Sequence, residues 1–384
     1  LLIFREFSIW IEASEWWCYH TFIMKSLLVF PAQWYPTQPY LSTPYLCAYL
    51  RNKNWDVTQR DFNIESYDHF LSPTLLENIL SKIEGRLTAL KEKKSFSFKE
   101  KSLMDVLATS VKFAPTIISG VNDAKQVMRT PERFFDFSTY KQADMVIKSA
   151  LKLVSDAYSP SILTLSTFES GTRAEESTQR ATEFARNNDI NPFIDLYEKV
   201  LLPSESWEDY NLVGISIVGI SQILPGLTLA RLLKEKYPHL HITLGGPIFS
   251  VNSKQLMGHP EFFQEFCDSI VTFEGEEPLH RLLTTLKNGS TLKNVPNLLF
   301  YENEKVEFNE ERVELRFEEM PSPSFDGLPM DLYLSPYPIL PVLQSRGCYW
   351  GKCTFCTHSF IYGHRYGKQR TEQMVDELES LAEK

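Results

Sequence analysis

Basic residues are scarce in this chain relative to acidic ones. The 384 residues include 39 Lys and Arg but 49 Asp and Glu, which gives a net charge of −10. Proteins that bind nucleic acids through the phosphate backbone depend on an excess of Lys and Arg. The composition therefore argues against a nucleic-acid partner, although it leaves room for a local basic patch. With 43% hydrophobic and 23% charged residues, the chain has enough apolar side chains to bury a large core.

The sequence pattern predicts neither a secretory signal nor a membrane-spanning segment. Residues 1–23 are rich in Trp, Phe and Ile, but charged residues such as Arg5 and Glu12 interrupt them, whereas a signal peptide needs a clean apolar core. Residues 211–230 carry no charge and are long enough to cross a membrane. Their polar side chains, glycines and Pro225 instead favour a buried strand followed by a helix. We therefore expect a cytoplasmic protein with no membrane partner.

The first residue is Leu1 rather than methionine. The segment that begins at Met24 has the character of a natural start, because an apolar strand follows at once. We expect residues 1–23 to be an extension outside the folded domain, and N-terminal sequencing of the natural protein tests this.

Cysteine is infrequent, and only three of the cysteines lie close together in the sequence. Of the six cysteines, Cys18, Cys47 and Cys267 are scattered, and each is expected to be a small buried hydrophobic residue. Without a secretory signal, a disulfide framework is not expected and a reducing compartment is.

The hydrophobic pattern alternates between strands and helices in two blocks of sequence. The first block predicts a strand at 25–30, a helix from Pro44 to Lys53 capped by Ser42 or Thr43, and a strand at 56–60. The second predicts strands at 212–218, 241–244 and 268–273, and helices at 224–237 and 276–287. Five strands that alternate with helices indicate an α/β fold with a doubly wound parallel sheet, for which we expect the flavodoxin-like order 2-1-3-4-5.

Residues 72–207 interrupt this alternation with helical periodicity, clearest near 75–83, 100–112, 140–155, 174–187 and 193–202. We expect a helical insertion or layer there. Its aromatic residues are better explained by packing than by a cofactor, and the pattern assigns it no chemistry.

Ligands of doubly wound sheets bind beyond the carboxyl ends of the strands. Ser216 and the Gly245-Gly246 turn fall at such ends, and glycine lets a ligand approach the backbone closely. Asp61 follows the second strand. It could face a ribose or polar tail of a ligand, or it could cap a helix in a solvated turn.

Cys348, Cys353 and Cys356 lie in one short loop with the spacing C-x4-C-x2-C. An apolar run at 339–343 precedes the loop and predicts a strand, and residues 371–384 predict a helix. Three thiolates can hold three irons of a [4Fe–4S] cluster and leave the fourth iron open. A Cys3His zinc site that includes His358 is an alternative, as are unreactive thiols or a disulfide pair.

This loop resembles the cluster-binding loop of radical S-adenosylmethionine (SAM) enzymes, with Phe355 at the aromatic position before the third cysteine. The usual spacing is C-x3-C-x2-C, so the first gap here is one residue longer. The resemblance implies a [4Fe–4S] cluster on the three cysteines, SAM at the open iron and Phe355 near the adenine of SAM. It also implies cleavage of SAM to a 5′-deoxyadenosyl radical that abstracts hydrogen from an unactivated carbon.

The preceding part of the chain resembles the cobalamin-binding domain of cobalamin-dependent radical SAM proteins. The resemblance covers 25–60 and 211–286, including the motifs GISI, LGGP and FEGEEP, and continues through a hairpin at 295–308 and a Pro-rich linker at 320–326. It implies cobalamin as a cofactor and C-methylation as the reaction. The implied cobalamin residues are Ser216, Gly245, Gly246, Glu274 and Gly275.

The motif D-x-H-x-x-G, whose histidine ligates cobalt in many cobalamin proteins, is absent from this sequence. If cobalamin binds, it binds without that ligand. The domain could also have kept the fold and lost the cofactor.

These observations predict a cobalamin-binding-like domain at 24–317, a Pro-rich linker at 318–338 and the start of a radical SAM barrel at 339–384. A complete barrel needs on the order of 200 further residues. We therefore expect a fragment that does not turn over SAM alone, and 5′-deoxyadenosine formed by this chain would contradict that.

The expected partners are a small-molecule or peptide substrate and an electron donor such as flavodoxin or ferredoxin. Two other functions stay open at this point. One is a radical SAM enzyme with a vestigial cobalamin domain, and the other is a non-catalytic binding protein with a zinc-stabilised loop.

Overall fold

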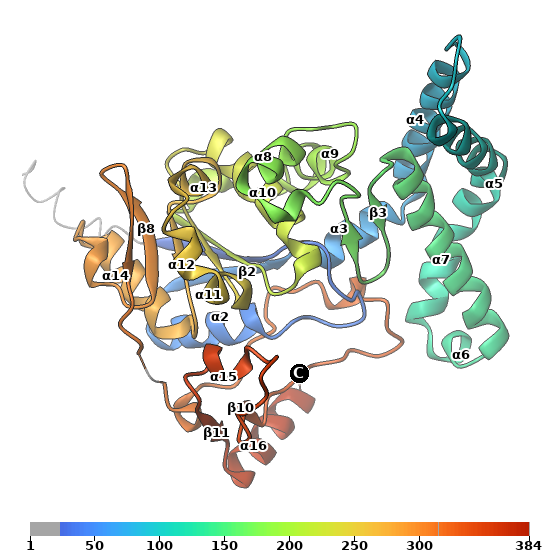
Figure 1. The fold of residues 1–384 in the computed structure, drawn as a ribbon. Coiled ribbons are helices and arrows are strands. Elements are labelled where there is room, and N and C mark those ends of the chain that lie inside the picture. Colours follow the sequence, from blue (N-terminus) through green and yellow to red (C-terminus); the bar gives the residue numbers. More distant parts are fainter. Residues whose placement is uncertain (1–23, 314, 384) are drawn as a thin grey trace, which may run out of the picture.

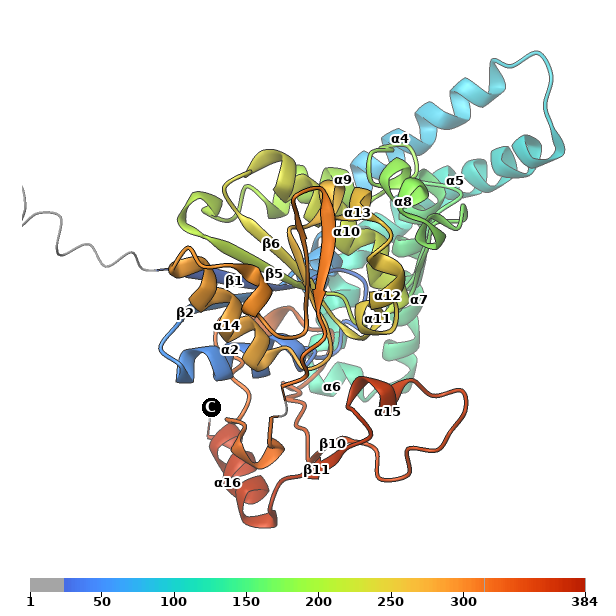
Figure 2. The same cartoon turned by 60° about the vertical axis from the view of Figure 1, so that its left-hand side comes forward.

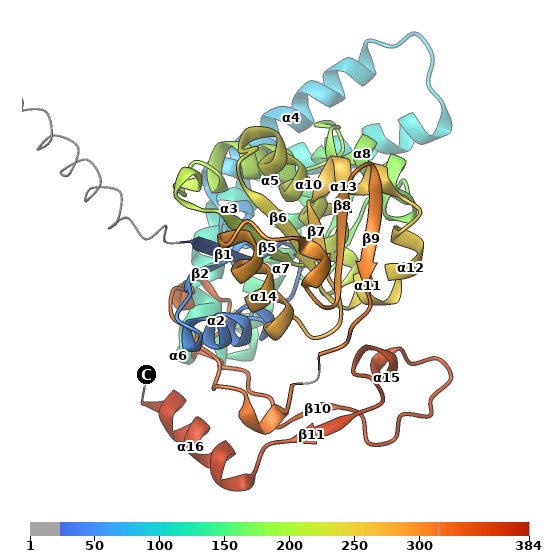
Figure 3. The same cartoon turned by 90° about the vertical axis from the view of Figure 1, so that its left-hand side faces the viewer.

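The computed structural model describes residues 24–313 and 315–383, so the extension expected at residues 1–23 lies outside the described residues. Figure 1 shows an α/β body around one large sheet, a group of long helices (α4, α5 and α7) beside it, and a C-terminal segment that carries β10, β11, α15 and α16. The C-terminal segment lies against the edge of the body to which α2 (Ser42–Asn52) and α11 (Pro247–Val251) also belong, as Figures 1 and 3 both show.

The described residues form a seven-stranded sheet in the order β2-β1-β5-β6-β7-β8-β9. The first five strands in this order are parallel, which confirms the expected 2-1-3-4-5 arrangement. The hairpin expected at 295–308 exists and extends the same sheet with two antiparallel strands. The strands are β1 Lys25–Phe30, β2 Asp56–Asp61, β5 Leu212–Ser216, β6 His241–Gly245, β7 Ser269–Val271, β8 Leu298–Glu302 and β9 Lys305–Asn309.

The central strands are apolar on both faces because helices cover the sheet on both sides. Leu28 points to the side covered by α2 (Ser42–Asn52) and α14 (Glu276–Lys287). Leu27 and Val29 point to the side covered by α3, α10 and α13, with bounds Phe62–Phe70, Ile223–Lys236 and Pro260–Phe266. Burying one such side chain contributes roughly 1.5–3 kcal/mol. Cys47 and Cys267 are buried in these two layers, as expected from the sequence, whereas Cys18 lies outside the described residues.

The helical layer expected within 72–207 is present. Its long helices begin at polar caps: the Ser72 side chain accepts from the Leu75 N–H, and Ser97 forms a reciprocal capping box with Glu100. The helices are α4 Pro73–Lys91, α5 Phe98–Arg129, α6 Pro131–Phe134, α7 Phe137–Ala157, α8 Thr178–Ala185 and α9 Phe193–Leu196. The short hairpin β3 (Ile162–Leu163) and β4 (Phe168–Glu169) follows α7.

Asp61 is a buried helix cap rather than part of a solvated turn. Its Oδ1 accepts hydrogen bonds from the backbone N–H groups of Asn63 and Ile64 at the start of α3. Its Oδ2 accepts one from the hydroxyl of Tyr333, 2.6 Å away in the linker. The capping alternative is therefore confirmed, and Asp61 is not among the residues that line the cavity described below.

Two local expectations are wrong. Residues 339–343 form no strand. Leu340 and Val342 instead pack as an irregular segment against Phe325, Leu328 and Leu381, and Pro341 has no N–H to donate to a sheet. The strand forms later, as β10 (Ser345–Gly347), which pairs antiparallel with β11 (Tyr366–Lys368).

The second wrong expectation concerns the start of α2. Leu41 is the N-cap residue and makes no capping bond through its side chain. Ser42 and Thr43 lie inside the first turn of α2 and so do not cap it. The helix expected after the cysteine loop is confirmed as α16 (Thr371–Ala382), and the short α15 (His358–Ile361) precedes β11.

Candidate functional site

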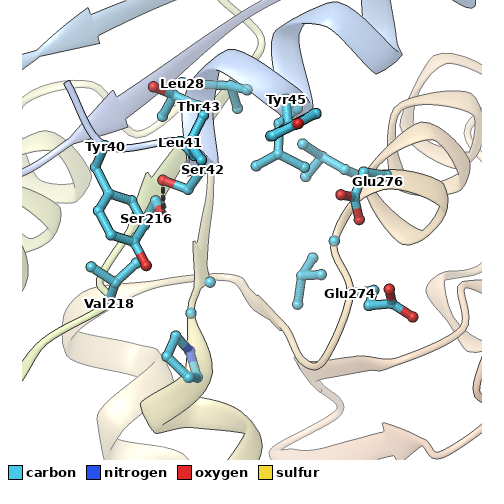
Figure 4. A pocket seen from close by; sticks show the side chains of 18 of the residues that line it. Leu28, Tyr40, Leu41, Ser42, Thr43, Tyr45, Ser216, Val218, Glu274 and Glu276 are labelled. Carbon is cyan, nitrogen blue, oxygen red and sulfur yellow. Dashed lines mark hydrogen bonds between the residues drawn. The ribbon is translucent and has the colours of Figure 1, made fainter. Parts of the chain in front are cut away.

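A cavity of about 510 Å³ lies at the carboxyl ends of β1, β5, β6 and β7. Its volume falls within the range of roughly 300–1,000 Å³ that is usual for ligand pockets. All five residues implied for cobalamin line it: Ser216, Gly245, Gly246, Glu274 and Gly275. They come from three different strand ends, so the doubly wound topology gathers them at one edge of the sheet. Figure 4 shows the cavity from close by.

The C-terminal segment forms the wall opposite the sheet. The residues that it contributes to the lining are Pro341, Leu343, Arg346, His358, Ile361 and Tyr362. The cavity is therefore enclosed between the α/β body and the segment that carries the cysteine loop. Because of this arrangement, a molecule bound there contacts both parts of the chain.

The Gly245-Gly246 turn has a strict steric requirement at its second residue. Gly246 has a φ of +128°, and a Cβ added to it lies 1.9 Å from the carbonyl oxygen of Ile217. No other residue type fits there without movement of the backbone. At Gly245, by contrast, an added Cβ meets only the carbonyl oxygen of Val271, at 3.7 Å. A side chain at position 245 is therefore compatible with the fold.

A hydroxyl pair and a group of aromatic rings mark one side of the cavity. The Ser216 hydroxyl donates to the Ser42 hydroxyl over 2.9 Å, which links the end of β5 to the first turn of α2, and Figure 4 shows the two side chains facing each other. Tyr40 lines the same side and stacks on Phe30, with ring centroids 5.2 Å apart. This side of the cavity offers hydroxyl groups and a flat apolar ring to a ligand.

Arg346 joins the cysteine-bearing segment to the opposite side of the cavity. Its guanidinium contacts Glu274 Oε1 at 3.3 Å and Glu276 Oε1 at 2.7 Å. Arg365 contacts the other oxygen of Glu274 at 2.5 Å. The side chains of Arg346, Glu274 and Glu276 are only 12%, 7% and 5% exposed. We call these four residues the ion-pair group.

Charge pairing compensates for the burial of this group. Burial alone lowers the pKa of Arg346, but the Glu276 and Glu274 carboxylates raise it above its ordinary value. The guanidinium therefore stays charged, and it holds β10 against the loop that follows β7.

Tyr45 supplies a buried hydroxyl that lacks a well-formed hydrogen bond. Its ring is 3% exposed, it lines the cavity, and within the described part of the chain its hydroxyl makes no hydrogen bond of acceptable geometry. Burial raises the pKa of Tyr45, and the Glu377 carboxylate raises it further, so the hydroxyl stays protonated. Because a buried unpaired hydroxyl is costly, Tyr45 is suited to a hydrogen bond with a ligand.

The cysteine loop is open in this structure. Cys353 and Cys356 are exposed, Cys348 is partly buried, and all three are free thiols. Gly347 precedes the loop with a φ of +87°, and its close approach to the Arg365 carbonyl lets β10 turn into the loop. Phe355, expected near the adenine of SAM, is exposed and does not line the cavity.

The structure does not bring the three thiols into a closed ligand set. Across residues 24–313 and 315–383, no group of three His, Cys, Asp or Glu side chains is arranged to hold a metal ion. His358, the fourth ligand of the zinc alternative, instead places a ring nitrogen 3.2 Å from the Gly347 carbonyl oxygen. The chemistry of the donors still fits an iron–sulfur cluster, because three accessible thiols follow one another on a single loop.

The sequence does not reveal several of the contacts and residues at the cavity. The ion-pair group joins positions 274 and 276 to positions 346 and 365, and no local pattern reveals such pairs. Tyr45 lies in an ordinary amphipathic helix, and His358 was considered only for zinc. The acidic run after β7 and the arginine beside the cysteines were the signals available.

The chain is similar to known proteins over part of its length. No family model matches the chain. An uncharacterized methyltransferase of Pyrococcus horikoshii is 32% identical over 178 residues, which is 45% of this chain and 37% of that protein. The hopanoid C-3 methylase of Methylococcus capsulatus is 25% identical over 222 residues, which is 54% of this chain and 39% of that protein. The chain thus spans less than two fifths of the length of either curated relative.

Two solved structures are similar in outline. The radical SAM methyltransferase TsrM from Kitasatospora setae, with cobalamin and a [4Fe–4S] cluster bound, has a TM-score of 0.41 and 14% identity over 93% of this chain and 45% of that chain. The cobalamin-dependent radical SAM enzyme OxsB, with aqua-cobalamin and SAM bound, has a TM-score of 0.38 and 25% identity over 48% of this chain and 24% of that chain. The two curated relatives are a methyltransferase and a methylase by name, which is the reaction class that the sequence resemblance implies. In the described part of the chain, no helix is long and apolar enough to cross a membrane.

Proposed function

We propose that this chain carries the cobalamin site and the cluster loop of a cobalamin-dependent radical SAM methyltransferase. One observation carries the proposal: the five residues implied for cobalamin from sequence motifs line one cavity, and the segment that bears Cys348, Cys353 and Cys356 forms its opposite wall. The methyltransferase relatives of Pyrococcus and Methylococcus support the reaction class. Because cobalamin is larger than most enzyme ligands, a cavity of this volume encloses only part of it.

When bound, the proposed [4Fe–4S] cluster would supply radical cleavage of SAM, and the proposed cobalamin would supply a transferable methyl group. The protein would hold these cofactors in position and shield them from water. The three cysteine thiolates are the proposed ligands of the cluster irons. At the cavity, the Ser42 and Ser216 hydroxyls and the Tyr45 hydroxyl, which lacks a well-formed hydrogen bond, are suited to hydrogen bonds with a bound corrinoid. Apolar residues of the strands, such as Leu28 and Val271, line the same cavity and would shield a bound ligand from water.

The proposed substrate is a small molecule or peptide with an unactivated carbon that accepts the methyl group. The proposed electron donor is a flavodoxin or ferredoxin. The net charge of −10 is the observation that argues against a nucleic acid as the methyl acceptor.

The test is a UV–visible spectrum of the chain after anaerobic reconstitution with iron, sulfide and hydroxocobalamin, followed by desalting. We expect a broad iron–sulfur band together with retained corrin bands. Substituting Cys348, Cys353 and Cys356 by Ser removes the first band and leaves the second. Retention of iron without corrin would favour the vestigial cobalamin domain. Zinc held in place of iron after anaerobic purification would favour the binding-protein alternative.

Gly245→Val provides a direct test of the cavity. The added Cβ meets only the Val271 carbonyl oxygen at 3.7 Å, so the fold is expected to persist while the isopropyl group occupies space beside the ligand. We expect cobalamin affinity, measured by fluorescence quenching or equilibrium dialysis, to fall at least ~10-fold, which is about 1.4 kcal/mol. Gly85→Val is the control, because Gly85 lies in α4 with no atom within 4 Å of an added Cβ. Equal affinities of the two variants would place cobalamin outside this cavity.

A further inference from the structure

The turn between α4 and α5 projects away from the rest of the molecule. Figures 1, 2 and 3 all show the two helices leaving the body together and ending in a free turn. The last buried residue of α4 is Leu87 and the first buried residue of α5 is Leu107. Between them, residues 88–106 include no buried side chain. The hairpin end is thus held by its own two helices and makes no part of the core.

The side chains at this end combine lysine with exposed phenylalanine. Residues 91–101, here called the hairpin tip, contain five lysines and two glutamates, in a chain whose net charge is −10. Phe96 is 45% exposed and Phe98 is 89% exposed. Lys93 pairs with Glu100 over 2.5 Å. Within the described residues, the other four lysines, Lys91, Lys94, Lys99 and Lys101, make no ion pair.

We propose that the hairpin tip is a docking surface for an anionic lipid bilayer. Lysines beside a negatively charged bilayer are attracted to its headgroups, and an exposed phenylalanine gains by entering the boundary between headgroups and acyl chains. The tip is basic although the whole chain carries a net charge of −10, so the charge complementarity to anionic lipid is confined to this projecting end. A projecting tip also matches a flat surface better than it matches the groove that a peptide ligand needs.

The contact is peripheral. No described helix is long and apolar enough to span a membrane, and the sequence analysis expected no membrane partner at all. The proposed contact differs from that expectation, because one end of the helical layer would touch the membrane surface. The proposal does not rest on the cofactors, because the tip lies outside the residues that line the cavity.

Vesicle flotation of the full 384-residue chain tests the proposal. Vesicles of phosphatidylcholine alone are compared with vesicles of equal parts phosphatidylcholine and phosphatidylglycerol. We expect binding to the anionic vesicles only, weakened by added salt. The double substitution Phe96→Ser with Phe98→Ser, and separately Lys94→Glu with Lys99→Glu, are each expected to weaken binding at least ~10-fold. All four side chains are exposed, so the melting temperature is expected to stay unchanged.

The matched control is Phe135→Ser with Phe137→Ser, which removes two exposed phenylalanines from the other end of the helical layer. This variant is expected to bind like the unaltered chain. Binding to neither vesicle, or binding that survives both tip variants, would overturn the proposal. So would binding that the lysine variant loses but the phenylalanine variant keeps, if soluble polyglutamate competes for it, because this indicates a site for polyanions in general.

Discussion

Replacing Arg346 by Met is expected to destabilise the chain by about 3–5 kcal/mol, because it leaves the buried Glu276 carboxylate without its ion-pair partner. Glu276 is the residue most affected. Its ion pair is with Arg346 at 2.7 Å, whereas Glu274 keeps its contact with Arg365. Removing one member of a buried pair costs far more than the pair itself contributes, since the remaining charge stays in a poorly solvated environment.

Urea unfolding followed by circular dichroism measures this effect. Arg316→Met is the matched control: Arg316 also contacts a carboxylate, Glu319 at 3.3 Å, but is 73% exposed, so its loss is expected to cost less than about 1 kcal/mol. A second substitution, Glu276→Gln, is expected to recover much of the lost stability in the Arg346→Met background but to destabilise the chain when made alone. Equal effects of Arg346→Met and Arg316→Met would show that the ion-pair group does not hold β10 in place.

The same variant bears on the proposed function. Arg346 lies two residues before Cys348 and lines the cavity. If the ion-pair group positions the cysteine loop against the cavity, Arg346→Met lowers the iron content and the corrin content after reconstitution, whereas Arg316→Met changes neither.

Asp61→Asn is expected to stabilise the chain above neutral pH, by roughly 4 kcal/mol at pH 8. Burial raises the pKa of Asp61 from 3.8 to about 7, against the opposing effect of hydrogen bonds from Tyr333, Ile64 and Asn63. The native carboxyl therefore keeps its proton in a range where the unfolded chain has lost it. Between about pH 4 and 7 the native state binds more protons, so the contribution of Asp61 to the free energy of unfolding falls as the pH rises.

Asparagine reproduces the neutral form of this group. Its Oδ1 can accept from the two backbone N–H groups that Asp61 caps, and its Nδ2 can donate to the Tyr333 hydroxyl, since these contacts use different oxygens of Asp61. The free energies of unfolding of both proteins are measured by urea titration from pH 4 to pH 8. The two are expected to agree near pH 4 and to diverge as the pH rises.

Asp326→Asn is the control for this series, because Asp326 lies in the linker that also carries Tyr333 but its side chain is 70% exposed. Its pH curve is expected to follow that of the unaltered chain. A constant difference between Asp61→Asn and the unaltered chain at every pH would mean that Asp61 is ionised throughout, and that its burial does not govern its protonation.

Local sequence pattern predicted the parts of the fold that local interactions determine. The buried strands at 25–30 and 212–216, and the helix at 276–287, were predicted closely because continuous apolar runs and amphipathic periods are properties of the segments themselves. The order of the five parallel strands was also correct, since few arrangements of alternating strands and helices satisfy the right-handed crossover rule.

The two local errors arose where tertiary contacts override such patterns. The apolar run at 339–343 has strand character, but its side chains pack against Phe325, Leu328 and Leu381 without joining a sheet. Ser42 has a good capping side chain, but its hydroxyl accepts a hydrogen bond from the Ser216 hydroxyl on one side of the cavity instead. In both cases a partner distant in the sequence decided the outcome.

For the candidate site, the sequence by itself determined which residues stand at the strand ends and that three thiols share one loop. Motif and spacing are enough for this, because the carboxyl ends of parallel strands must meet at one edge of the sheet. Only the tertiary structure decided that the cysteine-bearing segment closes the cavity, that Arg346 joins it to Glu274 and Glu276, and that the Tyr45 hydroxyl is buried without a well-formed hydrogen bond. These contacts join residues separated by tens to hundreds of positions, and their energies depend on burial, which a linear pattern does not contain.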